Sequence, residues 1–439
     1  MDLATRVVDL VGDRGEVEVS VVGGTSALTR FANSFIHQNV AEEGVAVSMR
    51  VALDGRVLSS ATTNTDPEAL VGFVDGVLEA AALQPSDLDW PGVTPPSGAG
   101  GEDHFDIATA EAGPAARAGQ VADFVAAGPG LRAAGYCETV GHEIAFANSL
   151  GHRVAGRYTA ATIDGIHQTD TSAGSGHAAS SRLGDLSGAA VGSLAAQRAL
   201  DSTDAYDVKP GEYEVVFAPE AVASIVIFLA GYGLQAKAHL EGQSFAELGT
   251  RQFDESFSLF DDATDPRAIG LWFDSEGTVR ERMALVDQGV TSGLAHDRRT
   301  AQKAGVESTG HAYPGSEVWG PMADSLFVSN GTEEVDGLIR EVERGLYVST
   351  FNYCRVLEPK SLVVTGLTRN GTFMIENGTI TGAVTNLRFT QSFVDGLQPG
   401  AVLGVGNDAR HADSEFGANI VFTPSLRLAS WAFTGGAAG

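Results

Sequence analysis

The stretch APEAVASIVIFLAGYGLQAKAHLEGQSF, residues Ala218–Phe245, carries no charged side chain between Ala221 and Leu234. A helix that crosses a membrane needs about 20 apolar residues. This run is shorter than that, and Glu220 and Lys237 flank it closely. The stretch therefore predicts an apolar helix within the core of a protein, and not a membrane span.

The composition is that of an acidic chain with a large core. With 439 residues, two or three domains are expected, and 43% hydrophobic residues suffice to bury a substantial core. The 56 acidic residues outnumber the 28 basic ones, and a net charge of −28 argues against binding to phosphate backbones. The first residues show no secretion signal, and Cys137 and Cys354 are too few for a disulfide framework or a cysteine-based zinc site. We expect a cytoplasmic protein that binds neither nucleic acid nor a membrane.

Helix and hairpin signals alternate in the first half of the chain. The first twelve residues have apolar side chains at helical spacing, and a second helix is expected after Asp66, an N-cap residue that a proline follows. The Asp54-Gly55 pair lies between two strand-like runs and predicts a β-hairpin. The pattern Phe-Ala-Asn-Ser-x-x-His occurs at residues 31–37 and again at 146–152. This repeat indicates either a duplicated supersecondary unit or two unrelated turns.

Two segments without periodicity divide the chain. The Pro- and Gly-rich segment 84–106 and the segment 201–215 have the composition of linkers. They predict an N-terminal α+β domain at residues 1–90, a central α+β segment at 91–206 and a strand-rich domain at 207–439. Helices dominate early and strands dominate late, so the predicted fold class is α+β. We expect an N-terminal α/β region with hairpins and helices, followed by a C-terminal domain of curved antiparallel sheets.

The histidines do not follow the spacing of a known metal motif. Glu143 follows His142, but the next histidine lies too far along a strand-like run to complete the helix of a zinc peptidase. His167 and His177 lie in a Gly/Ser-rich stretch. His311 lies in a turn-rich stretch, where it either stabilises the turn or lines a cleft. Without a nucleophile elbow or a phosphate-binding loop, the residues alone predict an acidic α+β protein with no visible active site.

A series of longer motifs resembles the TldD/PmbA family, whose older name is modulator of DNA gyrase. In chain order they are RFANSFIHQN (30–39), FANSLG (146–151), VVFAPEAVASIV (215–226), GLWFDSEGTVRERMALVDQGV (270–290), AGVESTGHA (304–312), TGLTRNGTFMIENGTITGAVTNLRFTQSF (365–393) and GND (406–408). Each motif alone is weak, and their common order makes the resemblance specific. The resemblance runs from about Thr25 to the C-terminus, close to the full length of the chain.

The resemblance implies a heterodimer of one metal-binding and one metal-free subunit. The TldD subunit carries H-E-x-x-x-H on a helix and a cysteine near its C-terminus, whereas the PmbA/TldE subunit shares the fold without these ligands. In this chain, Ile227, Phe228 and Tyr232 stand at the positions of the first histidine, the glutamate and the second histidine. None of them can bind zinc as an imidazole or activate water as a carboxylate. The chain therefore resembles the PmbA/TldE subunit.

The same resemblance implies a supporting role in a peptidase. The chain would hold no cofactor and would not be catalytic alone, while a TldD-like partner would hold zinc or a similar divalent metal. The pair would degrade unfolded or leader peptides, and this chain would close the peptide cavity beside the partner's metal. Ile227, Phe228, Tyr232 and His311 are the candidate cavity residues. A homodimer is the alternative assembly.

Two other functions stay open from the sequence. The first is an autonomous metallopeptidase with a non-standard metal site built from residues such as His142, His167, His177 or His311. The second is a binding protein that modulates a topoisomerase, as the older family name suggests. The net charge argues against direct contact with DNA but not against binding to a basic protein surface.

Overall fold

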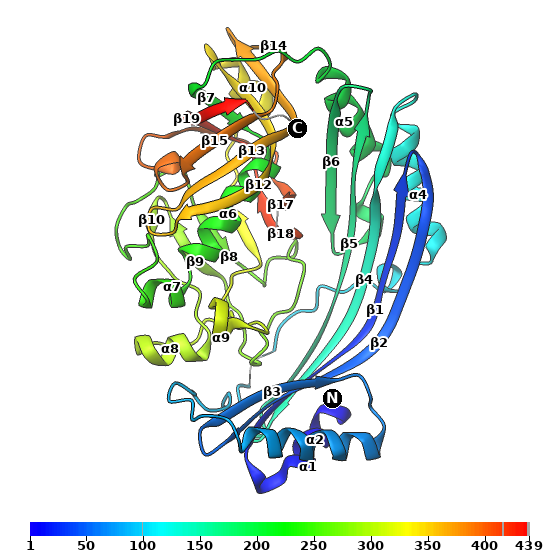
Figure 1. Cartoon of the computed structure of the whole chain (residues 1–439), viewed down its shortest axis with the longest axis vertical. Helices are drawn as coiled ribbons and strands as arrows, with labels where there is room; N and C mark the ends of the chain where they lie inside the picture. The colour runs from blue at the N-terminus through cyan, green and yellow to red at the C-terminus, as the bar shows by residue number, and fades with distance from the viewer. Residues whose placement is uncertain (99, 415–416, 437–439) are drawn as a thin grey trace.

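A computed structural model describes residues 1–98, 100–414 and 417–436 of the chain (Figure 1). The N-terminal half forms one long, curved sheet, with α1 and α2 at one end and α4 and α5 at the other. The C-terminal half lies on the concave side of this sheet and contains two further sheets. The predicted α+β class, with antiparallel sheets, is confirmed.

The first sheet has the strand order β3-β2-β1-β4-β5-β6, and all of its pairings are antiparallel. Its strands are β1 (Glu16–Ala32), β2 (Phe35–Leu53), β3 (Arg56–Thr62), β4 (Arg132–Asn148), β5 (Arg153–Gln168) and β6 (Ala173–Ser180). The helices of this half are α1 (Asp2–Val11), α2 (Pro67–Ala81), α3 (Ile107–Ala110), α4 (Pro114–Ala126) and α5 (Gly188–Asp201), with short 3-10 turns at Gly12–Arg14 and Leu183–Asp185.

Two units of the same design build this sheet. Each is a three-stranded meander between two helices, α1 and α2 in the first unit and α4 and α5 in the second. The central strands β1 and β4 pair antiparallel, and each copy of the repeated Phe-Ala-Asn-Ser pattern ends one of them at a hairpin turn. The structure agrees with a duplicated unit. The predicted linker 84–106 joins the two units, each of which supplies three strands to one sheet.

The local signals of the first half fold as expected, with one difference. Leu53 pairs with Arg56 across the predicted hairpin, and Asp54 and Gly55 take the positive φ angles, 48° and 76°, that a tight two-residue turn requires. Helix α2 begins at a proline after Asp66. The Asp66 side chain, however, accepts no capping hydrogen bond, so the residue acts through its extended backbone alone.

The C-terminal half contains two further sheets. One has the order β10-β9-β8-β11-β18-β17, from strands β8 (Leu259–Asp261), β9 (Met283–Asp287), β10 (Val290–Thr291), β11 (Leu326–Val328), β17 (Arg410–Ser414) and β18 (Gly417–Thr423). The other has the order β12-β7-β19-β15-β13-β14 and closes on itself because β12 also pairs with β13. Its strands are β7 (Gly211–Phe217), β12 (Arg344–Glu358), β13 (Val363–Glu376), β14 (Thr379–Ala383), β15 (Leu387–Ser392) and β19 (Leu426–Gly436), and β16 (Val402–Val405) pairs with β19. Two pairings, β7–β12 and β11–β18, are parallel.

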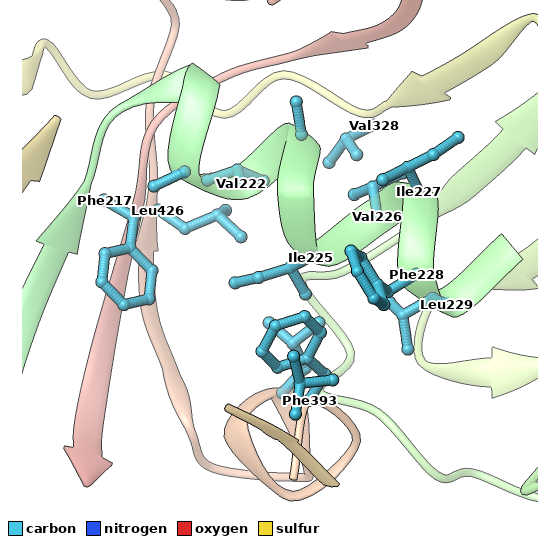
Figure 2. Close-up of a cluster of buried hydrophobic side chains, with 14 of the residues drawn as sticks. Phe217, Val222, Ile225, Val226, Ile227, Phe228, Leu229, Val328, Phe393 and Leu426 are labelled. Atoms are coloured by element: carbon cyan, nitrogen blue, oxygen red, sulfur yellow. The ribbon is translucent and has the colours of Figure 1, made fainter. Parts of the chain in front are cut away.

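The helices of this half are α6 (Pro219–Tyr232), α7 (Ala236–Leu240), α8 (Arg298–Ala304), α9 (Ser316–Trp319) and α10 (Val335–Arg340), with a 3-10 turn at Asp395–Leu397. Helix α6 is the apolar stretch of the sequence, and every residue from Pro219 to Ala230 is buried. Figure 2 shows its side chains packed among Phe217, Val328, Phe393 and Leu426 from the surrounding strands and loops. A helix that is apolar on all sides is stable only inside a core, which is where α6 lies.

No helix in the described ranges combines the length and the hydropathy that crossing a membrane requires.

A buried ion cluster joins the two halves at the N-terminus of α6. Glu220 is 4% exposed, and its carboxylate accepts hydrogen bonds of 2.9 and 3.2 Å from Arg410 of β17. Arg198 of α5 lies 3.6 Å from the same carboxylate. Burial opposes ionisation, but Arg410 and Arg198 lower the pKa of Glu220 to about 2. A carboxylate at the start of α6 also interacts favourably with the helix dipole.

Asp413 of β17, in the same region, should make stability depend on pH. Burial raises the pKa of Asp413 from 3.8 to about 6, although His177 opposes the shift, while Asp164 and Glu220 add to it. The pKa of Asp413 is higher in the folded protein than in the unfolded chain. The group therefore stabilises the fold at pH values below its unfolded pKa, and this contribution is lost as the pH rises through about 6. We expect Asp413→Asn to be more stable than the unmodified protein at pH 7.5, by about 1–2 kcal/mol, and equal to it near pH 3.5. Urea denaturation at both pH values measures this, and an equal difference at both would refute it.

Candidate functional site

A cavity of about 400 Å³ lies between the first sheet and the loops of the C-terminal half. Its sheet wall comes from β1, β4 and β5, and its opposite wall from the segments 269–280 and 310–324 and from β18. The lining residues are Ser20, Val22, Ile144, Phe146, Tyr158, Ile269, Gly270, Leu271, Phe273, Asp274, Ser275, Arg280, Gly310, His311, Ala312, Tyr313, Pro314, Met322, Asp324 and Ile420. The walls are mostly apolar, with a few polar groups, which is the usual character of a ligand site.

Asp274 fixes the two loops that form the outer wall. One of its carboxyl oxygens accepts hydrogen bonds from the backbone N–H groups of Glu276 and Thr278, at 2.9 and 2.8 Å. The other oxygen accepts from the backbone N–H of Ala312 at 2.9 Å. Burial and the charge of Glu276 raise the pKa of Asp274 to about 8, against the effect of these donors. Asp274 thereby ties the loop after residue 270 to the loop that carries His311.

Asp261, at the end of β8, is the centre of a buried ion network behind the cavity wall. It is 0% exposed and accepts hydrogen bonds from Arg280 (2.8 Å) and from His311 Nε2 (3.0 Å). The backbone N–H groups of Asp324 and Ser325 also donate hydrogen bonds to the Asp261 carboxylate, of 3.1 and 2.9 Å. Burial opposes ionisation of Asp261, but Arg280 and His311 hold its pKa well below the usual range. The network positions His311 and Arg280 rigidly at the cavity.

Arg280 bridges this buried network to a carboxylate that faces solvent. Its second terminal nitrogen lies 2.5 Å from Asp324, whose side chain is 55% exposed. Burial opposes the charge of Arg280, yet Asp261 and Asp324 raise its pKa above the ordinary value. One buried guanidinium is thus opposed by two carboxylates, of which Asp324 is the accessible one.

The four candidate cavity residues occupy different places. His311 is among the residues that surround the cavity, but its side chain is 0% exposed and contacts Thr309 of its own turn (2.8 Å) as well as Asp261. Ile227 and Phe228 are each 1% exposed and lie within the core around α6. The Phe228 ring stacks on Tyr232 at 5.6 Å and meets Phe393 edge-on at 5.9 Å. Tyr232, at the end of α6, is 38% exposed. Helix α6 approaches the cavity wall at Met322, since a Cβ built on Gly231 would lie 3.8 Å from the Met322 methyl group.

The surroundings of α6 do not fit the divalent metal that the resembled family implies. The side chains at the three motif positions are a branched alkane, a phenyl ring and a phenol, and the first two are enclosed by other apolar groups. Across the ranges that the structure covers, no group of three or more His, Cys, Asp or Glu side chains is arranged to hold a metal ion. Cys137 and Cys354 are both buried.

The histidines of the alternative metal site are not brought together. His142 of β4 lies 3.3 Å from Ser26, and His167 of β5 contacts the Phe124 carbonyl at 3.0 Å and stacks on its ring. His177 of β6 lies 3.4 Å from Asp164. His311 is held by Asp261 in the other half. Each of these four histidines therefore contacts different residues, and they do not form one site.

Sequence reasoning missed the acidic and basic residues of the site. Asp274 and Arg280 lie in the motif GLWFDSEGTVRERMALVDQGV, which marks the family resemblance without revealing a role for either. Asp261 and Asp324 lie in segments without any motif. The available signal was the Asp-x-x-Gly pattern of Asp274 and Gly277, which is typical of a loop ordered by its own carboxylate.

Comparison with known proteins gives a family match over the C-terminal half. Residues 210–435, just over half of the chain, match the model of the PmbA/TldA metallopeptidase C-terminal domain. A metalloprotease of Methanothermobacter thermautotrophicus is 25% identical over 224 residues, 50% of this chain and 48% of that protein. A metalloprotease TldD homolog of Buchnera aphidicola is 25% identical over 179 residues, 40% of this chain and 37% of that protein. The chain spans less than half the length of each of these curated relatives.

Solved structures match over nearly the whole chain. TldE of Thermococcus kodakarensis superposes with a TM-score of 0.85 at 18% identity, covering 99% of each chain. A candidate DNA gyrase modulator of Thermotoga maritima gives a TM-score of 0.84 at 17% identity, also over 99% of each chain. A third structure, a candidate DNA gyrase modulator of Bacteroides thetaiotaomicron, gives 0.85 at 20% identity, over 99% of this chain and 98% of that one. At these identities the likeness establishes the fold.

Proposed function

Because the chain belongs to the PmbA/TldA metallopeptidase family, we propose that it is the metal-free, PmbA/TldE-like subunit of a cytoplasmic heterodimeric metallopeptidase. Its partner is a TldD-like chain that supplies zinc or a similar metal, and the substrates are unfolded or leader peptides. One observation carries the proposal: Ile227 and Phe228, at two positions of the metal motif, are buried core residues of α6. Such side chains provide neither a ligand nor a base for hydrolysis.

The role of this chain in the pair is to complete the enclosure around the peptide. Enclosing a metal-bound water strengthens the electrostatic interactions at the reacting group and excludes folded substrates. The exposed end of α6, at Tyr232, supports this role, because it stands at the position of the partner's second histidine and presents a phenol to its surroundings. The net charge of −28 favours substrates and partner surfaces that are basic.

Reconstitution tests the proposal. A TldD-like chain with H-E-x-x-x-H from the same genome is purified alone and mixed with this chain. Cleavage of an unstructured polypeptide such as casein is followed by gel and mass spectrometry. We expect a heterodimer in native mass measurements and cleavage by the mixture at least about tenfold faster than by either chain alone. Cleavage by this chain alone would contradict the proposal, as would a mixture that neither associates nor cleaves. A stable homodimer that excludes the partner would favour the alternative assembly.

A further inference from the structure

The cavity between the first sheet and the loops of the C-terminal half is large enough for a small ligand. Its volume of about 400 Å³ lies at the low end of the range of about 300–1,000 Å³ for small-ligand sites. It therefore suits a group of one or two amino-acid residues better than a folded segment. Its apolar wall includes Ile144 and Phe146 of β4 and Phe273 and Met322 of the opposite loops. This wall favours a bulky apolar group in the interior of the cavity.

The accessible charge of the cavity is negative. Asp261 and Asp324 together oppose the single charge of Arg280, and Asp324 is the member of the network that reaches solvent. A ligand that presents a cation near Asp324 would form a charge-assisted hydrogen bond there, whereas a ligand anion would be repelled.

We propose that this cavity binds the amino-terminal residue of a peptide whose first side chain is large and apolar. The terminal ammonium group pairs with Asp324, whose side chain is 55% exposed, and the first side chain packs on the apolar wall. This proposal rests on the proposed function, because it names the end of the peptide substrate that this chain holds.

Calorimetric titration of the purified chain, without a partner or added metal, tests the inference. The probes are Leu-Gly-Gly, its N-acetylated form, Gly-Gly-Gly and isoamylamine, which carries the leucine-like alkyl group and an amine without a peptide. We expect Leu-Gly-Gly to bind, and each other probe to bind about tenfold more weakly or worse. Equal binding of the acetylated peptide would overturn the role of the ammonium group. Binding of isoamylamine as tight as that of the peptide would overturn the peptide as ligand.

Two variants locate the binding. Asp324→Asn removes the accessible charge and should weaken binding of Leu-Gly-Gly about tenfold or more. Asp75→Asn is the matched control, because Asp75 is similarly exposed (49%) and also pairs with an arginine, Arg14 of the 3-10 turn that follows α1. Val22→Phe fills the cavity from β1 and should abolish binding, and the melting temperature verifies that each variant is folded. Unchanged binding in folded Asp324→Asn or Val22→Phe would overturn the inference.

This test is separate from that of the proposed function. Partner-dependent cleavage without peptide binding by this chain would overturn the cavity assignment alone. Peptide binding that follows the expected pattern, in a chain that never supports cleavage, would overturn the subunit role and leave the cavity as a peptide-binding site.

Discussion

Replacing Asp261 with alanine is expected to lower the free energy of unfolding by about 3–5 kcal/mol, the range for breaking a buried ion pair by removing one partner. Asp261 is 0% exposed, and four hydrogen bonds converge on its carboxylate. Its loss leaves Arg280, itself 5% exposed, with one carboxylate partner in place of two. It also removes the acceptor of His311 Nε2 and of two backbone N–H groups, and buried polar groups without partners are costly.

Chemical denaturation followed by tryptophan fluorescence measures this effect. The matched control is Asp75→Ala, which breaks the exposed pair with Arg14 and should cost less than about 1 kcal/mol. A second consequence is local: since the network positions the cavity wall, Asp261→Ala should also abolish binding of Leu-Gly-Gly while the protein is still folded. If Asp261→Ala is no less stable than Asp75→Ala, the network is not the structural centre that its geometry indicates.

Replacing Phe228 with alanine is expected to cost about 3–5 kcal/mol of stability, the range for deleting a buried phenyl ring from a packed core. Phe228 is 1% exposed and contacts the rings of Tyr232 and Phe393. Phe228→Glu places at this position the carboxylate that the family motif has there. It should cost more than Phe228→Ala, because the carboxylate would be buried among apolar groups without a cationic partner.

Tyr232→Ala is the control for this pair of variants. It lies on the same helix and loses an aromatic ring of similar size, but at 38% exposure it should cost less than about half as much as Phe228→Ala. Denaturation curves of Phe228→Ala, Phe228→Glu and Tyr232→Ala measure these differences in the free energy of unfolding. A Phe228→Glu variant as stable as the unmodified protein would mean that α6 has room and solvent for a carboxylate, and the apolar character of the helix would then explain nothing about its function.

The parts of the fold that follow from the sequence are those that local chemistry determines. Asp54 and Gly55 supply the positive φ angles of a tight turn, and the proline after Asp66 starts a helix, so both elements could be predicted from a few neighbouring residues. The buried position of α6 was also predictable, because a run of 14 uncharged residues has no polar side to expose. The repeated Phe-Ala-Asn-Ser pattern left a duplicated unit and two unrelated turns open, and only the structure shows that each copy ends a central strand at a turn.

The candidate site could not be predicted in the same way, because distant segments build it. Asp261, Arg280, His311 and Asp324 lie within a span of more than sixty residues and meet only after β8 and β11 pair. The sheet wall comes from β1, β4 and β5, and the register of β1 and β4 is fixed by strand pairing across more than a hundred residues. Local spacing indicates neither relation, so the sequence around His311 favoured a role in its turn and did not reveal Asp261 as its partner.

Elemental analysis of zinc and iron in the chain, purified alone and without an affinity tag, tests the central claim most directly. The account predicts well below one metal ion per chain, because the side chains of α6 at the motif positions cannot bind one. The TldD-like partner, prepared in the same way, serves as the positive control and should contain about one. One tightly held metal ion per chain in this protein would contradict the metal-free subunit, and its histidines would then have to be replaced one by one to find the ligands.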